Sequence, residues 1–127
     1  MDLKYLQELL NRCYTKELCY PKVSQNWSEN NKCYGMCAIT ALILNDYFSG
    51  KLGKIYVEDI SHYFNIINDK IIDFTSSQFG YEVNYSNYEL VDRHIMLQNE
   101  NTKLRYQILK SQLEKLLQQE KNTEEVE

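Results

Sequence analysis

Three residues of this chain have side chains that can together support nucleophilic catalysis: Cys37, His62 and Asp73. A cysteine thiolate is a strong nucleophile, and a histidine takes up or releases a proton near neutral pH. An aspartate beside the imidazole fixes its tautomer and supports its cation. We therefore predict a catalytic set of nucleophile, base and orienting acid, which requires that the fold bring these side chains together.

The segment from Trp27 to Phe48 predicts how the fold presents the sulfur of Cys37. A polar loop leads to Gly35 and Cys37, and an apolar run of helical length then ends at Ser49-Gly50, a helix-end signal. Cys37 is expected in the first turn of a buried helix, where free N–H groups and the helix dipole favour a thiolate and an oxyanion. Gly35 should let the backbone approach whatever lies in front of the sulfur, and Trp27 should anchor the loop.

Two apolar runs on either side of Asn68-Asp69 predict a β-hairpin, because this dipeptide is typical of two-residue hairpin turns. In such a hairpin Ile67 faces Lys70, and the side chains alternate between the two faces. His62 and Asp73 then share one face as diagonal neighbours, which lie roughly 7–8 Å apart at Cα and within side-chain reach. The aspartate is therefore expected to hold one ring nitrogen of the histidine.

The remaining patterns predict an α+β fold with N-terminal helices packed on a small antiparallel sheet and a C-terminal helix. We expect a single domain over residues 1–120 and an acidic, disordered tail over residues 121–127. The other expected elements are helices over residues 2–12 and 103–119, strands over Lys51–Val57 and Tyr81–Tyr85, and a short helix that runs from a Ser86-x-x-Glu89 capping box to Leu97.

Composition argues against several classes of partner. The chain of 127 residues has a net charge of −4 and no basic patch, so nucleic acid is not an expected partner. No apolar run approaches the length of a membrane span, and the N-terminus lacks the apolar core of a signal peptide. We therefore expect a cytoplasmic protein with no membrane contact, present as a monomer or a weak dimer.

The four cysteines are Cys13, Cys19, Cys33 and Cys37. Disulfides are not expected in a reducing compartment. A structural zinc site is the alternative, but the spacing contains no C-x-x-C knuckle and Cys37 heads an apolar helix. Independent thiols are therefore the default, and neither a metal nor a cofactor is predicted.

The order of the three candidate residues resembles the papain-like superfamily, especially its transglutaminase-like branch. In that branch a His-x-aromatic-Asn strand precedes a hydrophobic-Asp-hydrophobic-Thr strand, and the matching segments here are His62-Tyr63-Phe64-Asn65 and Ile72-Asp73-Phe74-Thr75. The resemblance implies a papain-like (transglutaminase-like) core with Cys37, His62 and Asp73 in the three catalytic roles. We add Trp27, Gly35 and Asn65 as substrate-binding or supporting residues.

A second set of motifs covers most of the chain: Trp27-Ser28, the segments Gly35–Leu42 and Asp46–Gly50, the two strand motifs, Gln78-Phe79, and Thr102, Arg105-Tyr106 and Leu109. Together these motifs resemble the small bacterial YunG-like family. That family has no established activity, so the resemblance implies the fold and the candidate site but no substrate. Met36 stands where the family usually has Gln, and if that Gln contacts an oxyanion or a substrate, this chain lacks the contact.

Two kinds of function fit these patterns. The first is a thiol-dependent enzyme that hydrolyses or transfers an acyl or amide group of a peptide or small molecule through a thioester at Cys37. The second is a non-catalytic binding or regulatory module on the same papain-like scaffold, with a groove for an extended peptide. In that second case His62 and Asp73 are a structural pair and Cys37 is an unreactive core residue.

Overall fold

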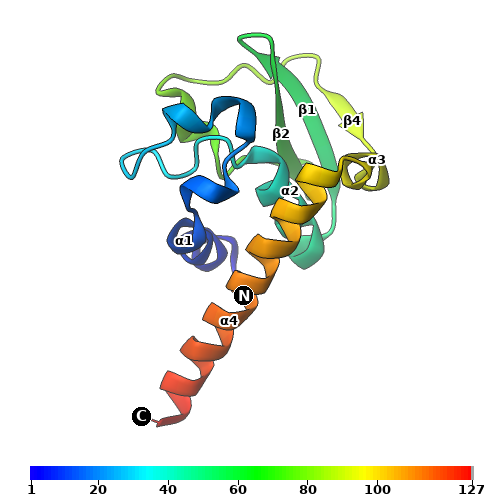
Figure 1. The fold of residues 1–127 in the computed structure, drawn as a ribbon. Helices are drawn as coiled ribbons and strands as arrows, with labels where there is room; N and C mark the ends of the chain where they lie inside the picture. The colour runs from blue at the N-terminus through cyan, green and yellow to red at the C-terminus, as the bar shows by residue number, and fades with distance from the viewer. Residues whose placement is uncertain (127) are drawn as a thin grey trace.

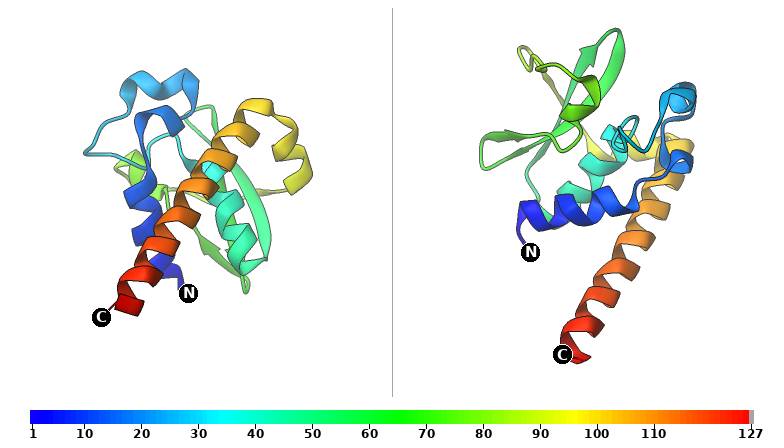
Figure 2. Two further views of the ribbon diagram at one scale, coloured as in Figure 1. Left: turned by 60° about the horizontal axis from the view of Figure 1, so that its bottom comes forward. Right: turned by 90° about the vertical axis from the view of Figure 1, so that its left-hand side faces the viewer.

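Helix α2 (Cys37–Phe48) lies at the centre of the molecule, between a four-stranded antiparallel sheet and two further helices (Figures 1 and 2). The computed structural model describes the backbone of residues 1–126 and the side chains of residues 1–123. Helix α1 (Leu3–Cys13) and the long helix α4 (Glu100–Val126) cover the side of α2 that faces away from the sheet. The predicted α+β architecture of N-terminal helices, antiparallel sheet and C-terminal helix is therefore confirmed.

The position of α2 between two layers follows from its sequence. Its residues from Ile39 to Leu44 are all buried, so this part of the helix has no exposed face and must be covered on every side. The helix begins at Cys37 and ends before Ser49, whose φ of 60° stops the helical path, as the sequence predicts. Cys37 therefore lies in the first turn, where backbone N–H groups have no partner within the helix.

The sheet has the strand order β3-β2-β1-β4. The predicted hairpin joins β2 (Ile60–Ile67) to β3 (Lys70–Ile72), with Ile67 opposite Lys70. Asn68 and Asp69 both have positive φ, 52° and 63°, which is the backbone that a two-residue turn of this kind requires. The predicted turn and register are confirmed, and Asp73 follows directly after the last residue of β3.

The two faces of the sheet belong to two hydrophobic clusters. Ile67 lies in the main core with α1, α2 and α4, and Tyr63 and Ile72 pack against it. Phe64 and Ile66 lie in a second, smaller cluster, in which they pack against side chains of the loop that follows β3. The alternation predicted for the hairpin is therefore observed for these residues.

The fourth strand occupies a segment that the sequence assigns to a helix. Glu89–Val91 forms β4, which pairs with β1 (Lys51–Val57), and the following helix α3 (Arg93–Gln98) starts only after Asp92, whose side chain caps it. The capping box predicted at Ser86 was wrong because pairing with β1 determines the conformation of Glu89. The strand expected over Tyr81–Tyr85 is also absent from the described residues.

Helix α4 is longer than predicted and continues through residues 121–126, where a disordered tail was expected. Glu127 lies outside the described residues. The apolar stripe is also shifted, because Leu104 and Ile108 are exposed while Arg105, Leu109 and Leu113 are buried. Among the described residues, no helix combines the length and the apolar character that crossing a bilayer requires.

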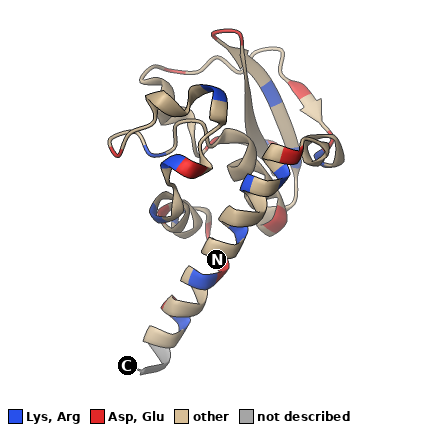
Figure 3. Cartoon of the chain, viewed as in Figure 1, with Lys and Arg blue, Asp and Glu red and all other residues tan. Residues whose placement is uncertain are grey.

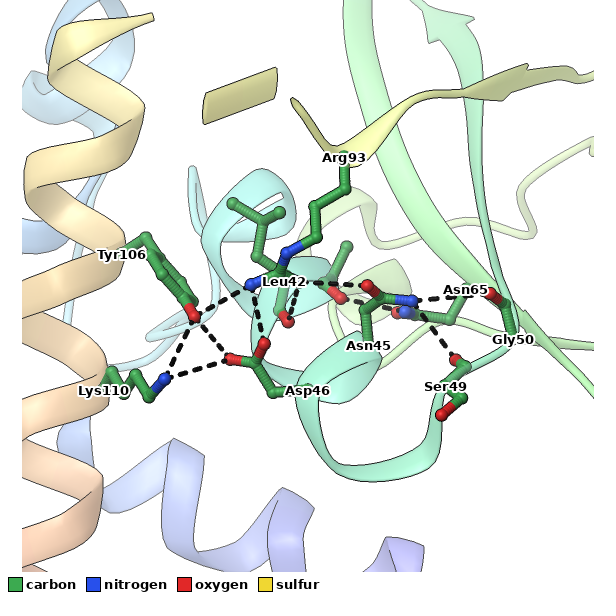
Figure 4. Close-up of polar contacts among 10 residues, drawn as sticks. Leu42, Asn45, Asp46, Ser49, Gly50, Asn65, Arg93, Tyr106 and Lys110 are labelled. Carbon is green, nitrogen blue, oxygen red and sulfur yellow. Dashed lines mark hydrogen bonds and ion pairs between the residues drawn. The ribbon is translucent and has the colours of Figure 1, made fainter. Parts of the chain in front are cut away.

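A polar cluster ties α2, α3 and α4 together (Figure 4). Arg93 donates to Leu42 O and Asn45 Oδ1 at 3.0 Å, and it forms an ion pair with Asp46 at 2.6 Å. The Tyr106 hydroxyl lies between Asp46 and Arg93. Because these contacts join α2 to α3 and α4, the cluster fixes the orientation of α2. Other charged residues are dispersed over the molecule, with basic residues spaced along α4 (Figure 3).

Candidate functional site

His62 and Asp73 form a buried pair, as the hairpin predicts. His62 Nε2 lies 2.6 Å from Asp73 Oδ2, and the two side chains are only 2% and 5% exposed. His62 comes from β2 and Asp73 from the residue just past β3, so the short hairpin is what brings them together. Phe79 packs edge-on against the imidazole, with ring centroids 4.9 Å apart.

Every other contact of the Asp73 carboxylate also comes from a donor. The Tyr85 hydroxyl donates to Oδ2 at 2.7 Å, and the Thr75 backbone N–H and hydroxyl approach Oδ1 at 3.1 and 3.3 Å. This network holds the carboxylate in one orientation and provides the partners that a buried charge needs. Tyr85 in turn has a raised pKa, because burial and the neighbouring Asp73 both disfavour its phenolate.

The pair keeps His62 protonated at neutral pH. Burial alone lowers the pKa of His62, but the hydrogen bond to Asp73 and the nearby Cys37 thiol raise it to about 9, from an ordinary value of 6.5. His62 Nε2–H therefore donates to Asp73, and the ring carries a positive charge in the folded protein.

The second ring nitrogen of His62 is left without a partner. Nδ1 is sealed from solvent and makes no hydrogen bond to any described residue. A buried N–H without an acceptor costs free energy and is rare in folded proteins. The orphan nitrogen is therefore a candidate donor to a group that approaches from the side of Cys37.

Cys37 lies next to this pair at the start of α2. As a residue Cys37 is partly exposed, whereas Cys13, Cys19 and Cys33 are buried. The Cys37 thiol is near enough to His62 to raise the pKa of the imidazole. Burial raises the pKa of the Tyr63 phenol, and the nearby Cys37 raises it further. The structure thus brings the three predicted residues into one region, in which Cys37 is partly exposed and His62 and Asp73 are buried.

The loop before Cys37 is fixed by contacts with η3 (Ser76–Phe79) and with itself. Gln78 accepts from the Gly35 N–H at 3.1 Å and donates to Thr75 O at 2.9 Å, and Asn31 donates to Gln78 O at 3.0 Å. The Trp27 indole N–H donates to Lys32 O at 2.9 Å, which ties down the predicted anchor of the loop. These contacts connect the position of Cys37 to the segment that carries Asp73.

A glycine is required at position 35 because atoms of the neighbouring segment Cys19-Tyr20 leave no room for a side chain. Its φ is +74°, and a Cβ at this position would overlap Cys19 Sγ and lie 3.0 Å from Tyr20 N. The close approach predicted for Gly35 therefore exists, but the group that approaches is the segment Cys19-Tyr20.

Replacing Gly35 with alanine is expected to lower the free energy of unfolding by about 2–4 kcal/mol, because a left-handed backbone and an overlap with fixed atoms both oppose the methyl group. Gly80→Ala is the matched control: Gly80 also has a positive φ, 70°, but no atom lies within 4 Å of the added Cβ. The control should lose only about 1 kcal/mol. Chemical denaturation of both variants measures the difference, and equal losses would show that the loop is not tightly packed.

Two other positions from the sequence prediction are buried inside the fold. The Asn65 side chain is buried and donates to Ala41 O at 2.9 Å, so it contacts the backbone of α2 beyond its first turn (Figure 4). Met36 is fully buried in the main core. Its side chain therefore does not face a substrate beside Cys37.

The cysteines do not converge into a metal-binding cluster. Within the described part of the chain, no group of three or more His, Cys, Asp or Glu side chains is arranged to hold a metal ion. Cys33 instead approaches Ser77 Oγ at 3.4 Å and Thr75 O at 3.8 Å.

A surface hollow of about 480 Å³ lies beside the pair, with polar side chains of Asn30, Asn31 and Gln78 in its lining. Phe79 belongs both to this lining and to the edge-on contact with His62. The hollow and the imidazole therefore share Phe79 as a neighbour, and Cys37 is not part of the lining.

Thr75 and Tyr85, the two residues that complete the polar network of Asp73, were not predicted as site residues, and the burial of Arg105 on α4 was not predicted either. A signal for Arg105 exists in the sequence: it precedes Leu109 and Leu113 at intervals of four residues, so all three share one helix face. Tyr85 lies in an irregular loop and has no such signal.

Comparisons with known proteins give one family. A family model described as "YunG protein" matches residues 2–118. The "Uncharacterized protein YunG" of Bacillus subtilis (strain 168) is 39% identical over 62 residues, which are 49% of this chain and 54% of that protein. The matched part thus spans about half the length of the relative. No solved structure matches the chain.

Proposed function

This chain belongs to the YunG protein family, and from that premise we propose that it is a thiol-dependent enzyme that hydrolyses or transfers an acyl or amide group. In this proposal Cys37 is the nucleophile, His62 the acid and base, and Asp73 the group that orients and charges the imidazole. The arrangement resembles that of papain-like, transglutaminase-like enzymes, and we extend the proposal to a papain-like core.

The observation that carries the proposal is the state of His62. A buried imidazole that is paired with a carboxylate on one nitrogen has an N–H with no acceptor on the other. A structural His–Asp pair has no need of an unsatisfied N–H, whereas a catalytic one needs a donor free for the sulfur and for the substrate. The partly exposed Cys37 next to this donor favours the catalytic interpretation.

The proposed reaction has two steps. The Cys37 thiolate attacks the carbonyl carbon, the imidazolium gives its Nδ1 proton to the departing amine or alkoxide, and a thioester forms. Water or an acceptor amine then attacks the thioester while the neutral imidazole takes up its proton, and the thiolate departs. Free N–H groups in the first turn of α2 are suited to stabilise the oxyanion in both steps.

The experiment is alkylation by iodoacetamide at pH 6.5, with the adduct at each cysteine quantified by mass spectrometry. We expect Cys37 to react about tenfold faster than free cysteine, because only about 1% of an ordinary thiol is ionised at this pH. A lower intrinsic nucleophilicity of a stabilised thiolate removes part of the full gain. In His62→Gln the rate at Cys37 should fall at least to that of free cysteine.

The comparison with free cysteine is essential, since the other three cysteines are buried residues and Cys37 would be labelled first in any case. A wild-type Cys37 that reacts no faster than free cysteine, or a His62→Gln variant that is folded and equally reactive, would sink the proposal.

The alternative is a non-catalytic binding module on the same scaffold. The observation in its favour is the polar hollow beside the pair, whose lining does not include Cys37. A ligand held there would bind Cys37→Ser as well as wild type, whereas the enzyme proposal predicts complete loss of turnover in that variant.

A further inference from the structure

The Asp73 carboxylate accepts two hydrogen bonds on a single oxygen. His62 Nε2 lies 2.6 Å from Oδ2, and the Tyr85 hydroxyl donates to the same atom at 2.7 Å. The other oxygen, Oδ1, is occupied by the backbone N–H and the hydroxyl of Thr75. A carboxylate has about four acceptor positions, so these donors fill it. His62 and Tyr85 therefore share one oxygen, and Oδ1 has no free position for either of them.

The phenol of Tyr85 is held in place by packing as well as by its hydrogen bond. Its ring packs edge-on against Phe64, with the ring centroids 5.0 Å apart, and Phe64 is 1% exposed. The Phe64 ring is itself confined by Gly53 on β1, where a Cβ would come within 2.6 Å of Phe64 Cζ. The smaller hydrophobic cluster therefore fixes Tyr85 as a donor to Oδ2.

A second tyrosine of the same loop packs on the same ring but makes no such contact. Tyr88 lies edge-on to Phe64, with the centroids 5.5 Å apart. It is exposed, and its hydroxyl donates to no described residue. The contact with Asp73 is therefore particular to Tyr85 and does not follow from packing against Phe64 alone.

The titratable groups that face His62 directly are Asp73, from the segment after β3, and Cys37, from α2. The residue opposite His62 on β1 is Ile55, and η3 contributes Phe79, neither of which carries a charge. Tyr85 reaches the imidazole only through Asp73, so any effect of Tyr85 on His62 is an effect on the carboxylate.

A second donor weakens the attraction of this carboxylate for the imidazole proton. The hydrogen bond from Tyr85 stabilises negative charge on Oδ2, which leaves less of that charge to attract the imidazolium. A general acid has to release its proton during the reaction, and it works best with a pKa near the operating pH. Without the Tyr85 hydroxyl, Asp73 would hold the His62 proton more tightly and the imidazole would be a poorer acid.

We propose that Tyr85 is a positioning residue that moderates, through the shared oxygen of Asp73, the attraction of the carboxylate for the imidazolium and so keeps His62 able to donate its proton. The inference rests on the proposed function and adds to the Cys-His-Asp set one residue that acts through Asp73. The two oxygens of the carboxylate then have different tasks: Thr75 fixes its orientation at Oδ1, and Tyr85 adjusts its charge at Oδ2.

The experiment is an NMR titration of the His62 ring between pH 6 and 11 in wild type, Tyr85→Phe and Tyr88→Phe. The chain has two histidines, so His94→Gln assigns the signals. Phenylalanine at position 85 keeps the ring that packs on Phe64 and removes only the hydroxyl. Tyr88→Phe is the matched control, because it removes the hydroxyl of the other tyrosine on the same ring.

In Tyr85→Phe the pKa of His62 should rise by about 0.5–1 pH unit above the wild-type value of about 9. In Tyr88→Phe it should stay within about 0.2 pH unit of wild type. A loss of packing alone would lower stability without raising this pKa, so the titration separates the proposed role from a structural one. A folded Tyr85→Phe with an unchanged or lower pKa of His62, or an equal rise in Tyr88→Phe, overturns the inference.

If Tyr85→Phe does not fold, Thr75→Val provides the second test. This change removes the hydroxyl that lies 3.3 Å from Asp73 Oδ1 and leaves the backbone N–H of residue 75 in place. Because the bond is longer than that of Tyr85, the pKa of His62 should rise by a smaller amount, about 0.3 pH unit. The absence of any rise would show that donors to Asp73 do not control the imidazole, which overturns the inference.

The titration does not depend on the chemistry of Cys37, which separates this inference from the proposed function. An unchanged His62 titration in Tyr85→Phe beside a fast wild-type Cys37 refutes the role of Tyr85 alone. A wild-type Cys37 that reacts like free cysteine refutes the catalytic roles of both His62 and Tyr85, whatever the titration shows.

Discussion

Asp73→Asn is expected to lower the free energy of unfolding by about 3–5 kcal/mol, because removing one charge of a buried pair leaves the other uncompensated. The effect is large here since the carboxylate is the shared acceptor for His62, Thr75 and Tyr85. The amide has one acceptor oxygen in place of two, and its NH₂ group opposes the donors that surround it. Such a loss is a large part of the total stability of a typical domain.

Asp59→Asn is the matched control for this variant. Asp59 is exposed in the turn between β1 and β2 and has a φ of 66°, a conformation that asparagine tolerates. It should change the stability by less than about 0.5 kcal/mol. Urea denaturation at pH 7 measures both variants, and an Asp73→Asn protein within 1 kcal/mol of wild type would mean that the network is energetically unimportant.

Raising the pH from 6.5 to 9 is expected to remove about 3 kcal/mol of stability from the wild-type protein. The pKa of His62 is about 9 in the folded state and 6.5 when the chain is unfolded. Because the folded value is the higher one, the folded protein binds the extra proton. The stabilisation is therefore complete below pH 6.5 and is lost as the pH rises through 9.

The variant that isolates this effect is His62→Gln, in which the stability should change much less over the same range. His94→Gln removes an exposed histidine and should keep the wild-type dependence. Denaturation curves at several pH values test the expectation. Parallel curves for wild type and His62→Gln would contradict a protonated His62, since the remaining titrating groups are common to both proteins.

The site was predictable to the extent that local sequence determines it. The helix start at Cys37 and the turn at Asn68-Asp69 both follow from strong local signals, and together with strand alternation they determine the contact between His62 and Asp73. A turn one residue longer or shorter would have placed these two side chains on opposite faces of the sheet.

The rest of the site depends on contacts between distant segments. Tyr85 reaches Asp73 through an irregular loop that has no periodic pattern. Arg105 is buried and donates to the carbonyl of Leu18, 87 residues away in the chain. A helical pattern read from apolar residues alone omits an arginine on the buried face and includes Leu104, which is exposed.

The most direct measurement is the second-order rate constant of Cys37 with iodoacetamide at pH 6.5, relative to free cysteine under the same conditions. A thiol activated by the His62–Asp73 pair gives a ratio of about ten or more. A ratio of one or below would contradict the proposed catalytic role and leave the pair as a structural feature of the fold.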